Sequence, residues 1–192
     1  MSGYFHNAVA YSHKILHSVI SPGDFVIDAT CGNGQDTVFL AQLTGRQGKV
    51  MAFDIQAEAI EKTRQLLLKH QCLEQVILIE DSHANLGAYK PEKIKAAMFN
   101  LGYLPGGDHN IITSSNDTIA ALKTIMDNLV LGGVVTIVGY PGYDAGQQEL
   151  NEISKYLSGL TQKNFEIINI KAINQRNNPP QILVCSRING GI

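Results

Sequence analysis

The sequence lacks cysteine pairs, long apolar runs and a surplus of positive charge. Its three cysteines (Cys31, Cys72 and Cys185) form no CxxC pair, which argues against a disulfide framework or a cysteine-based zinc site and predicts a reducing cytoplasm. No run approaches the roughly 18–20 apolar residues that span a membrane, and no early run resembles a signal peptide. The formal net charge of −2 excludes a globally basic nucleic-acid binder, so an RNA partner would have to meet a local basic patch.

The chain also lacks internal repeats, low-complexity tracts and a linker long enough to separate domains. We therefore expect one domain over residues 1–192, with an N-terminal helix at about residues 6–20 packed on it. His13 and His17 lie one turn apart on that helix, but no third metal ligand accompanies them. They are interpreted as part of a polar helix face near the catalytic rim, and no metal site is predicted.

Five short β-branched or apolar runs predict buried strands. They cover residues 25–28, 49–54, 76–79, 94–99 and 133–138. Apolar residues at helical spacing predict helices over 119–129 and 150–160. The first has a capping box at Ser114-x-x-Asp117, and Asp144 is the expected N-cap of the second. This alternation implies a parallel sheet covered on both faces, with ligands bound beyond the carboxyl ends of the strands.

The C-terminal part departs from this alternation. Residues 165–173 and 181–188 are two strand-like runs joined by the polar loop 174–180, with no helix between them. Such runs should pair antiparallel. A seven-stranded, mostly parallel sheet closed by a C-terminal antiparallel hairpin, with helices on both faces, is the topology of class I methyltransferases. This Rossmann-like α/β fold lies outside the ordinary dinucleotide-binding strand order.

The segment with the most candidate ligand-binding residues is Asp28-Ala-Thr-Cys-Gly-Asn-Gly-Gln-Asp-Thr37, which follows the first expected strand and begins a helix. Gly32 and Gly34 allow a tight turn and a close approach of the backbone to a ligand. As a NAD-binding fingerprint the segment is incomplete, because Thr37 stands where a third small residue is needed. Cys31 lies near a helix N-terminus, which can lower the pKa of a thiol, but we interpret it as a small side chain in a crowded turn.

Acidic residues follow each of the first three strands. Asp54 ends the second strand, 20 residues after Gly34, where an acid can accept both hydroxyls of a ribose. Asp81-Ser82-His83 follows the third, where an acid or amide usually meets an adenine amino group. A pyrophosphate would be repelled by Asp28 and Asp36, whereas a cationic ligand without phosphate fits. The pattern predicts S-adenosylmethionine (SAM) as the cofactor in preference to NAD, unless the acids merely cap turns.

The fourth strand runs into Asn100, which is followed by an aromatic residue and a proline. This order is similar to the Asn-Pro-Pro-aromatic motif of amino-group methyltransferases, in which the amide oxygen and a backbone carbonyl hold the N–H groups of the acceptor. Positioning of that kind lowers a barrier by on the order of 7–11 kcal/mol at ideal alignment. No cysteine follows Pro105, so transfer to nitrogen is favoured over covalent addition to a pyrimidine carbon. The alternative is an ordinary glycine-rich loop.

Three tyrosines are expected at one rim of this pocket. Tyr103, Tyr140 and Tyr143 would stack an extruded base at ~1–3 kcal/mol each, although scattered surface tyrosines remain the alternative. The polar loop 176–180 is expected to project toward the same rim. Its arginine and amides could contact phosphate or ribose.

These segments together resemble the small rRNA methylase (YtqB-like) family of Gram-positive bacteria over nearly the whole chain. The likeness rests on Asp28-Ala-Thr-Cys-Gly-Asn-Gly34, Phe53-Asp-Ile-Gln56, Asn100-Leu-Gly-Tyr-Leu-Pro-Gly-Gly-Asp108, Tyr140-Pro-Gly142 and Asn177-Asn-Pro-Pro180. Its members are tRNA 5-aminomethyl-2-thiouridine methyltransferases of the MnmM type. The resemblance implies a SAM-dependent N-methyltransferase that methylates the aminomethyl group of the tRNA wobble uridine, with the anticodon arm as partner.

The residue patterns and the resemblance together give a candidate site. The expected cofactor-binding residues are Asp28, Cys31, Asn33, Gly34, Asp36, Thr37, Asp54, Gln56, Asp81, Ser82 and His83. The expected substrate-binding residues are Tyr103, Leu104, Pro105, Tyr140, Pro141, Tyr143, Arg176, Asn177 and Asn178. The expected catalytic residues are Asn100, Tyr103, Asp108 and His109. The chain departs from the family at His109, where a lysine is expected, and at Tyr143, where a histidine is commoner.

Several alternatives remain open from the sequence. An alkyl amine is mostly protonated at neutral pH, and Asp108, His109 or a water held by Asn100 could accept its proton. The acceptor could instead be an rRNA base or a small amine. A NAD-dependent oxidoreductase is less favoured, and a non-catalytic binding module leaves the Asn100 segment unexplained. A homodimer is a further expectation, because one small domain offers limited surface for gripping an anticodon arm.

Overall fold

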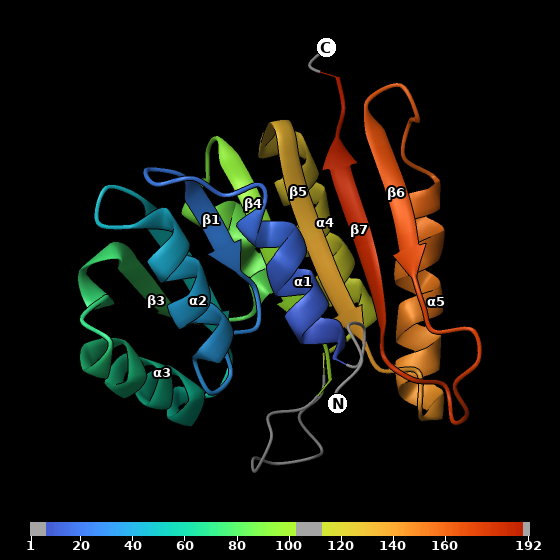
Figure 1. Ribbon diagram of the computed structural model, residues 1–192, viewed down its shortest axis with the longest axis horizontal. Coiled ribbons are helices and arrows are strands. Elements are labelled where there is room, and N and C mark those ends of the chain that lie inside the picture. The colour runs from blue at the N-terminus through green and yellow to red at the C-terminus, as the bar shows by residue number, and fades with distance from the viewer. Residues whose placement is uncertain (1–6, 103–112, 190–192) are drawn as a thin grey trace.

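A computed structural model describes residues 7–102 and 113–189. It contains a seven-stranded sheet in the order β3-β2-β1-β4-β5-β7-β6 (Figure 1). The strands are β1 (Phe25–Asp28), β2 (Lys49–Asp54), β3 (Val76–Glu80), β4 (Ile94–Asn100), β5 (Leu129–Gly139), β6 (Phe165–Ile170) and β7 (Gln181–Arg187). The first five strands pair in parallel, and β7 pairs antiparallel with both β5 and β6. The predicted class I methyltransferase topology is confirmed.

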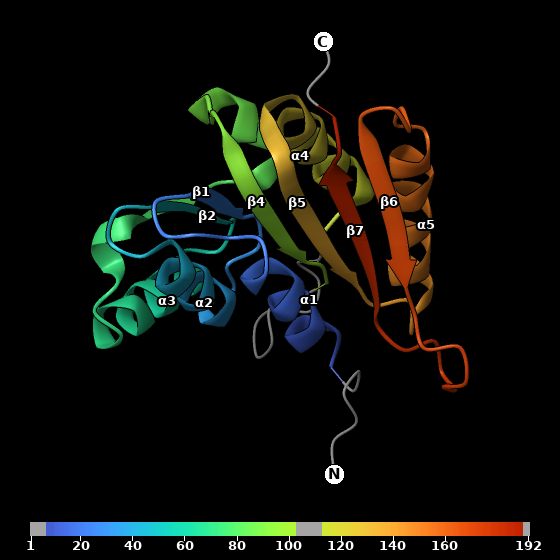
Figure 2. The same ribbon diagram turned by 45° about the horizontal axis from the view of Figure 1, so that its top comes forward.

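Helices cover both faces of the sheet. The elements are α1 (Ala8–His17), α2 (Gln35–Thr44), α3 (Ala57–Lys69), the 3₁₀ helices η1 (Leu73–Gln75) and η2 (His83–Tyr89), α4 (Ser115–Asn128) and α5 (Asp144–Ser158). Helices α1, α2 and α3 lie on one face, whereas α4 and α5 lie on the other, as the two views agree (Figure 1 and Figure 2). Within the described ranges, no helix is both long and apolar enough to cross a membrane.

The core is split by the sheet into layers because successive strand residues point to opposite faces. In β1, Val26 packs with the residues beneath α2 and α3, whereas Ile27 packs with those beneath α4 and α5. Phe53 and Phe99 are fully buried on the same side as Ile27. Burial on both faces explains why the central strands read as nearly continuous apolar runs.

Three predicted helix starts can be compared with the structure. Helix α1 begins after Asn7, whose Oδ1 atom accepts hydrogen bonds from the backbone amides of Val9 (3.0 Å) and Ala10 (3.3 Å). The helix covers Ala8–His17 and is therefore shorter than the predicted helix at about residues 6–20. The Ser114 cap of α4 is confirmed by its 3.2 Å bond from the Asp117 amide. The predicted N-cap of α5 is wrong: Tyr143 holds that position, and Asp144 is the first helical residue.

Two strand ends differ from the prediction by more than one residue. Strand β5 starts at Leu129 because α4 ends at Asn128, and the register shifts before β5 pairs regularly from Val134 onward. Strand β6 ends at Ile170, three residues early, where it pairs with Ile182, and β7 extends only one residue beyond that pair, to Gln181. Chain beyond Ile170 therefore forms part of the loop.

Candidate functional site

The candidate site lies where the strand order reverses. Strand β1 continues through α2 to β2 on one side, whereas its neighbour β4 is followed by α4 and β5 on the other. The loops after β1 and β4 therefore leave in opposite directions and open a crevice at the carboxyl edge of the sheet. Nearly all sequence-predicted site residues that the structure describes lie along this edge.

Asp28 holds the first loop from inside the protein. The side chain is fully buried, and its two oxygens accept hydrogen bonds from Thr37 Oγ1 (2.6 Å) and the Thr30 amide (3.2 Å). Burial, followed by the nearby charge of Asp36, raises the pKa of the Asp28 carboxyl from 3.8 to about 7, although the hydrogen bonds act in the opposite direction. Asp28 therefore ties the end of β1 to the first turn of α2.

The two glycines make the turn that the sequence predicts. Gly32 has φ +52° and Gly34 has φ +83°, a region that favours glycine. A Cβ atom at Gly34 would lie 2.9 Å from the Cα atom of Thr63, so a side chain there would collide with α3. Thr63, which the sequence patterns did not single out, also donates a 3.1 Å hydrogen bond to the Gly32 carbonyl.

Cys31 is a packing residue in this turn. It is buried, and burial together with the charges of Asp28 and Asp54 raises the pKa of its thiol well above the ordinary value. A thiol kept protonated in this way is a poor nucleophile. The interpretation of Cys31 as a small side chain in a crowded turn is therefore supported over a reactive cysteine.

Asp54 joins the end of β2 to the glycine turn. One carboxylate oxygen accepts a 3.0 Å bond from the Gly32 amide, and the other accepts a 3.0 Å bond from the Gln56 amide. Both bonds use backbone donors, and a carboxylate has further acceptor positions for a ligand hydroxyl. The neighbouring Ile55 is 54% exposed and adds an apolar surface at this edge that the sequence patterns did not reveal.

The third acidic position is a hydrogen-bonded carboxylate at the surface. Asp81 accepts hydrogen bonds from Asn85, Tyr89 and the Ser82 amide, and the pKa of its carboxyl is lowered by the bonds from Asn85 and Tyr89 above all. Ser82 caps η2 through a bond from the Ala84 amide. An ionised acid therefore stands at the end of β3.

His83 follows Asp81 and points into the protein. It is buried, which lowers the pKa of the imidazole, and its ring packs edge-on against Phe99 at 5.7 Å. It hydrogen-bonds to the Ala29 backbone, whereas its buried Nε2 atom has no hydrogen-bond partner. His83 is therefore a neutral, buried histidine whose Nε2 atom makes no hydrogen bond within the described part of the chain.

Asn100, at the end of β4, is the centre of a polar network. Its Nδ2 atom donates to Asp36 Oδ2 at 3.3 Å, and its Oδ1 atom accepts a 2.8 Å bond from the Tyr140 hydroxyl. Its backbone amide donates to Thr30 Oγ1 at 2.8 Å. Residues that lie far apart in the sequence therefore converge on the side-chain amide of Asn100, at the point where the strand order reverses.

Asp36 extends this network to α1. Its Oδ1 atom lies 2.7 Å from His13 Nε2, and the His13 ring stacks on Phe39 with centroids 3.8 Å apart. Sequence reasoning placed His13 on a polar helix face but missed this partner. Among residues 7–102 and 113–189, no group of three histidine, cysteine or acidic residues could hold a metal ion.

The substrate side brings two of the three predicted tyrosines together. A Cβ atom at Gly102 would lie 3.9 Å from both Tyr140 Cδ2 and Tyr143 Oη, so both rings border the chain that leaves β4. The pKa of Tyr140 is raised by burial and by the charge of Asp36. The remaining predicted residues of this segment lie outside the described residues: Tyr103, Leu104, Pro105, Asp108 and His109.

The loop between β6 and β7 lies against the turn after β5. A Cβ atom at Gly142 would lie 3.7 and 3.8 Å from the carbonyl oxygens of Asn177 and Asn178. Both asparagines have positive φ (63° and 45°), which this residue type tolerates best after glycine. Arg176 is exposed beside them, and Pro141 is buried in the adjacent turn.

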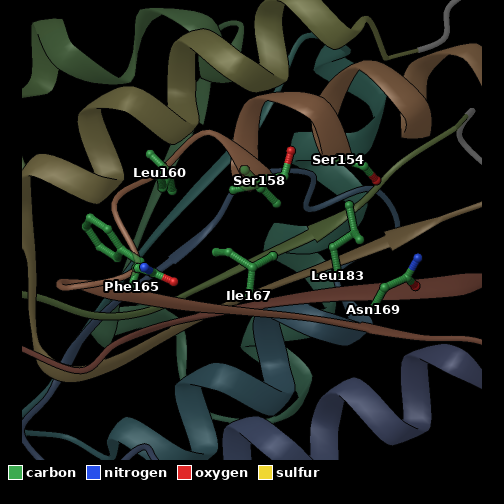
Figure 3. A pocket seen from close by; sticks show the side chains of 9 residues that line it. Ser154, Ser158, Leu160, Phe165, Ile167, Asn169 and Leu183 are labelled. Carbon is green, nitrogen blue, oxygen red and sulfur yellow. The ribbon is translucent and has the colours of Figure 1, made fainter.

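A separate pocket of about 400 Å³ lies between α5 and the outer strands (Figure 3). Its lining is Ser154, Leu157, Ser158, Leu160, Gln162, Phe165, Ile167, Asn169 and Leu183. None of these side chains titrates near neutral pH or acts as a nucleophile as strong as a thiolate. Among the described residues, the polar side chains at the point where the strand order reverses therefore remain the best candidates for a catalytic site.

Comparisons with known proteins agree with this geometry. The family model described as "Putative rRNA methylase" matches residues 50–186. A protein of Arabidopsis thaliana described as "tRNA (mnm(5)s(2)U34)-methyltransferase, chloroplastic" is 37% identical over 95% of this chain and 70% of its own length.

Solved structures extend the likeness to three dimensions. A "putative rRNA-methylase" of Clostridium thermocellum superposes with a TM-score of 0.92 at 44% identity, covering 95% of this chain and 98% of that one. A "putative methyltransferase" of Streptococcus mutans, in complex with SAH, gives a TM-score of 0.85 at 36% identity, covering 94% and 98%. The chain therefore belongs to the rRNA methylase family and has the fold of class I SAM-dependent methyltransferases.

Proposed function

We propose that the chain transfers a methyl group from SAM to the aminomethyl nitrogen of 5-aminomethyl-2-thiouridine at the tRNA wobble position. The observation that carries the proposal is the half-buried Asn100 amide, which is held at the end of β4 by Asp36 and Tyr140. The activity in the description of the Arabidopsis relative is of the same kind. A tRNA is accordingly the proposed substrate, recognised through its anticodon arm.

The residues along the carboxyl edge fit a SAM nucleoside. Asp54 has acceptor positions for the ribose hydroxyls, and Gln56 stands beside it. Asp81 and Ser82 would face the adenine, with exposed Ile55 offering an apolar contact to its ring, and the buried His83 would support this end of the site from inside the protein. When bound, SAM supplies an electrophilic methyl group on a positively charged sulfur.

The glycine turn would hold the amino-acid end of the cofactor. The proposed residues of this end are Asp28, Cys31, Asn33, Gly34, Asp36 and Thr37. Asp28 and Thr37 act by fixing the turn, since their side chains bond to each other. The negative charge of this region attracts a cation and opposes a pyrophosphate, which favours SAM over NAD.

The acceptor side would hold a uridine base beside the Asn100 amide. The Asn100 Oδ1 atom accepts one hydrogen bond from Tyr140 and has a second lone pair for an amine N–H. The rings of Tyr140 and Tyr143 would support the base, and Pro141 shapes the turn between them. Arg176, Asn177 and Asn178 would contact the RNA backbone. Tyr103, Leu104 and Pro105 are proposed as further substrate-binding residues, and Tyr103, Asp108 and His109 as further catalytic residues.

The cellular setting and assembly are part of the same proposal. Free thiols at Cys31, Cys72 and Cys185, all buried, suit a reducing cytoplasm. A homodimer would widen the surface that grips the anticodon arm.

Nucleoside mass spectrometry tests the proposed function. Purified protein and SAM are incubated with tRNA carrying 5-aminomethyl-2-thiouridine, and conversion to the 5-methylaminomethyl form is expected. A parallel reaction uses undermethylated rRNA, because the family description names rRNA, and another uses a small alkyl amine. Methylation of either alternative, with the tRNA left unchanged, would overturn the proposed acceptor. Titration with SAH and NAD separates the two cofactors, and SAH alone is expected to bind.

A further inference from the structure

The Asp36 carboxylate bridges a helix and a strand beside the proposed acceptor position. One oxygen lies 2.7 Å from His13 Nε2, and the other accepts the 3.3 Å bond from Asn100 Nδ2. Asp36 is only 8% exposed, so this arrangement is shielded from bulk water. A carboxylate fixed in this way stands one hydrogen bond from the amide that would orient the amine.

His13 is itself fixed from two directions. Its ring stacks on Phe39 of α2 with an interplanar angle of 7°. The residue before it, Ser12, donates a buried 2.7 Å hydrogen bond to Thr136 Oγ1 of β5. Helix α1 is therefore anchored to the sheet in a position that directs His13 toward Asp36.

The chemistry of an alkyl amine requires a proton acceptor at this point. The nitrogen arrives mostly as an ammonium ion, which has no lone pair to attack a methyl group. A positioned base typically contributes a factor of 10²–10⁴ to such a step. The described residues nearest to Asn100 offer one carboxylate in direct contact with its amide, namely Asp36.

We propose that Asp36 accepts the proton of the substrate ammonium and that His13 acts as a positioning residue for this carboxylate. This inference rests on the proposed function, because an alkyl amine, unlike an adenine amino group, must lose a proton before it can attack. In the step, an N–H bond of the ammonium breaks and an O–H bond forms at Asp36 Oδ2. The electron pair stays on nitrogen as the attacking lone pair. Asp36 changes from a carboxylate to a carboxylic acid, and the proton passes to water after product release.

Other groups around Asp36 favour the binding of a cation. The titratable groups that interact with it include His13 from α1, Asp28 from β1 and Tyr140 after β5. Asp36 raises the pKa of both Asp28 and Tyr140, which shows that its negative charge is felt across the site. An ammonium ion entering beside Asn100 therefore meets the negative charge of Asp36.

The pH dependence of single-turnover rates tests the role of Asp36. An anticodon stem-loop carrying the aminomethyl nucleoside is methylated by wild type and Asp36→Asn between pH 6 and pH 10. We expect Asp36→Asn to be at least about 10²-fold slower at pH 7. The deficit should shrink steadily with rising pH, because the free amine then exists without a base. A deficit that stays constant across this range, or full activity of the variant at pH 7, would overturn the proposal.

Two substitutions of His13 test positioning and remain informative if Asp36→Asn folds poorly. His13→Leu removes the hydrogen bond to Asp36 and should lower the rate at pH 7 about tenfold, with recovery at high pH. His13→Gln retains an N–H donor and should restore the rate to within about threefold of wild type. His70→Gln, at an exposed position after α3, is the matched control and should equal wild type. Equal losses in both His13 variants at every pH would contradict positioning of Asp36.

A binding measurement separates this inference from the proposed function. In the presence of SAH, wild type should bind the aminomethyl stem-loop at least about fivefold more tightly than a 5-hydroxymethyl analogue, whereas Asp36→Asn should bind the two equally. Asp127→Asn, at an exposed position on α4, is the control. Conversion by wild type without this difference would refute Asp36 as the acceptor and leave the function standing. No conversion by wild type at any pH would refute both.

Discussion

Tyr140 and Asn100, 40 residues apart in the sequence, are joined by a 2.8 Å hydrogen bond from the tyrosine hydroxyl to the Asn100 Oδ1 atom. The bond links the ends of the adjacent parallel strands β4 and β5. Because Asp36 holds the other side of the same amide, the plane of the Asn100 side chain is fixed before an acceptor arrives. Preorganisation of this kind is what an in-line methyl transfer requires.

Asn100→Ala should retain cofactor binding and lose most turnover. We expect kcat to fall at least about 10²-fold, because the amine is no longer oriented, while the Kd for SAH stays within about threefold. Calorimetry with SAH and single-turnover kinetics measure the two quantities. If this variant methylates at the parental rate, the acceptor assignment is incorrect.

Asp54→Asn should have the opposite effect. The amide loses one of the two acceptor oxygens that hold the Gly32 and Gln56 amides, and it binds ribose hydroxyls less strongly. We expect the Kd for SAH to rise about 10- to 100-fold, with little change in the affinity for tRNA. Asp127→Asn on the exposed side of α4 is the control. An unchanged Kd for SAH would remove Asp54 from the cofactor site.

Asp28 should make folding stability depend on pH. Because burial raises its pKa from 3.8 to about 7, the unfolded chain ionises first as the pH rises. The free energy of unfolding of the wild type should therefore fall between about pH 4 and pH 7 and then level off. Between pH 5 and pH 8 the wild type should lose about 2–3 kcal/mol more than Asp28→Asn. Denaturant titrations at the two pH values measure this difference, and parallel losses would contradict it.

Gly34→Ala should destabilise the chain through its backbone and through α3. The residue has φ +83°, which costs roughly 1–2 kcal/mol for a residue with a side chain, and the added Cβ would collide with Thr63. We expect a loss of about 2–4 kcal/mol in the free energy of unfolding. Gly142→Ala, whose added Cβ would meet only atoms at 3.7 Å or more, is the stability control. A similar loss in both variants would argue against this explanation.

Arg176→Ala should weaken binding of tRNA and leave the cofactor unaffected. Loss of one phosphate contact is expected to raise the Kd about 3- to 10-fold and to reduce the slope of log K against log salt by about 0.7–0.9. Lys163→Ala, before the start of β6 and thus at the opposite edge of the sheet, is the control. An unaltered salt slope would exclude Arg176 from contact with phosphate.

The gathering of the acidic residues at one edge of the sheet could be predicted because these residues follow strands directly. Asp28, Asp54 and Asp81 stand at strand ends, and parallel strands bring their carboxyl ends to one edge. Asn100 was predictable for the same reason. The pattern of apolar runs predicted where the strands end, and the composition of the loops that follow predicted which polar residues lie there.

Contacts that depend on packing between distant elements could not be predicted. His13 reaches Asp36 only because α1 is anchored on β5 by the bond between Ser12 and Thr136, which no local pattern encodes. Thr63 contacts the glycine turn from the middle of α3, where it resembles any half-polar helical residue. The exposure of Ile55 likewise depends on how α3 departs from β2.

The reversal of strand order at β1 and β4 divides the work of the molecule between two stretches of sequence. Residues that would hold the nucleoside come before β4, and those that would contact the RNA base and backbone come from β4 onward, whereas Asp36 and His13, which come before β4, would act on the amine itself. A change of the RNA that is recognised can therefore be confined to the later stretch, whereas a change from an alkyl amine to another acceptor would also involve Asp36 in the earlier one.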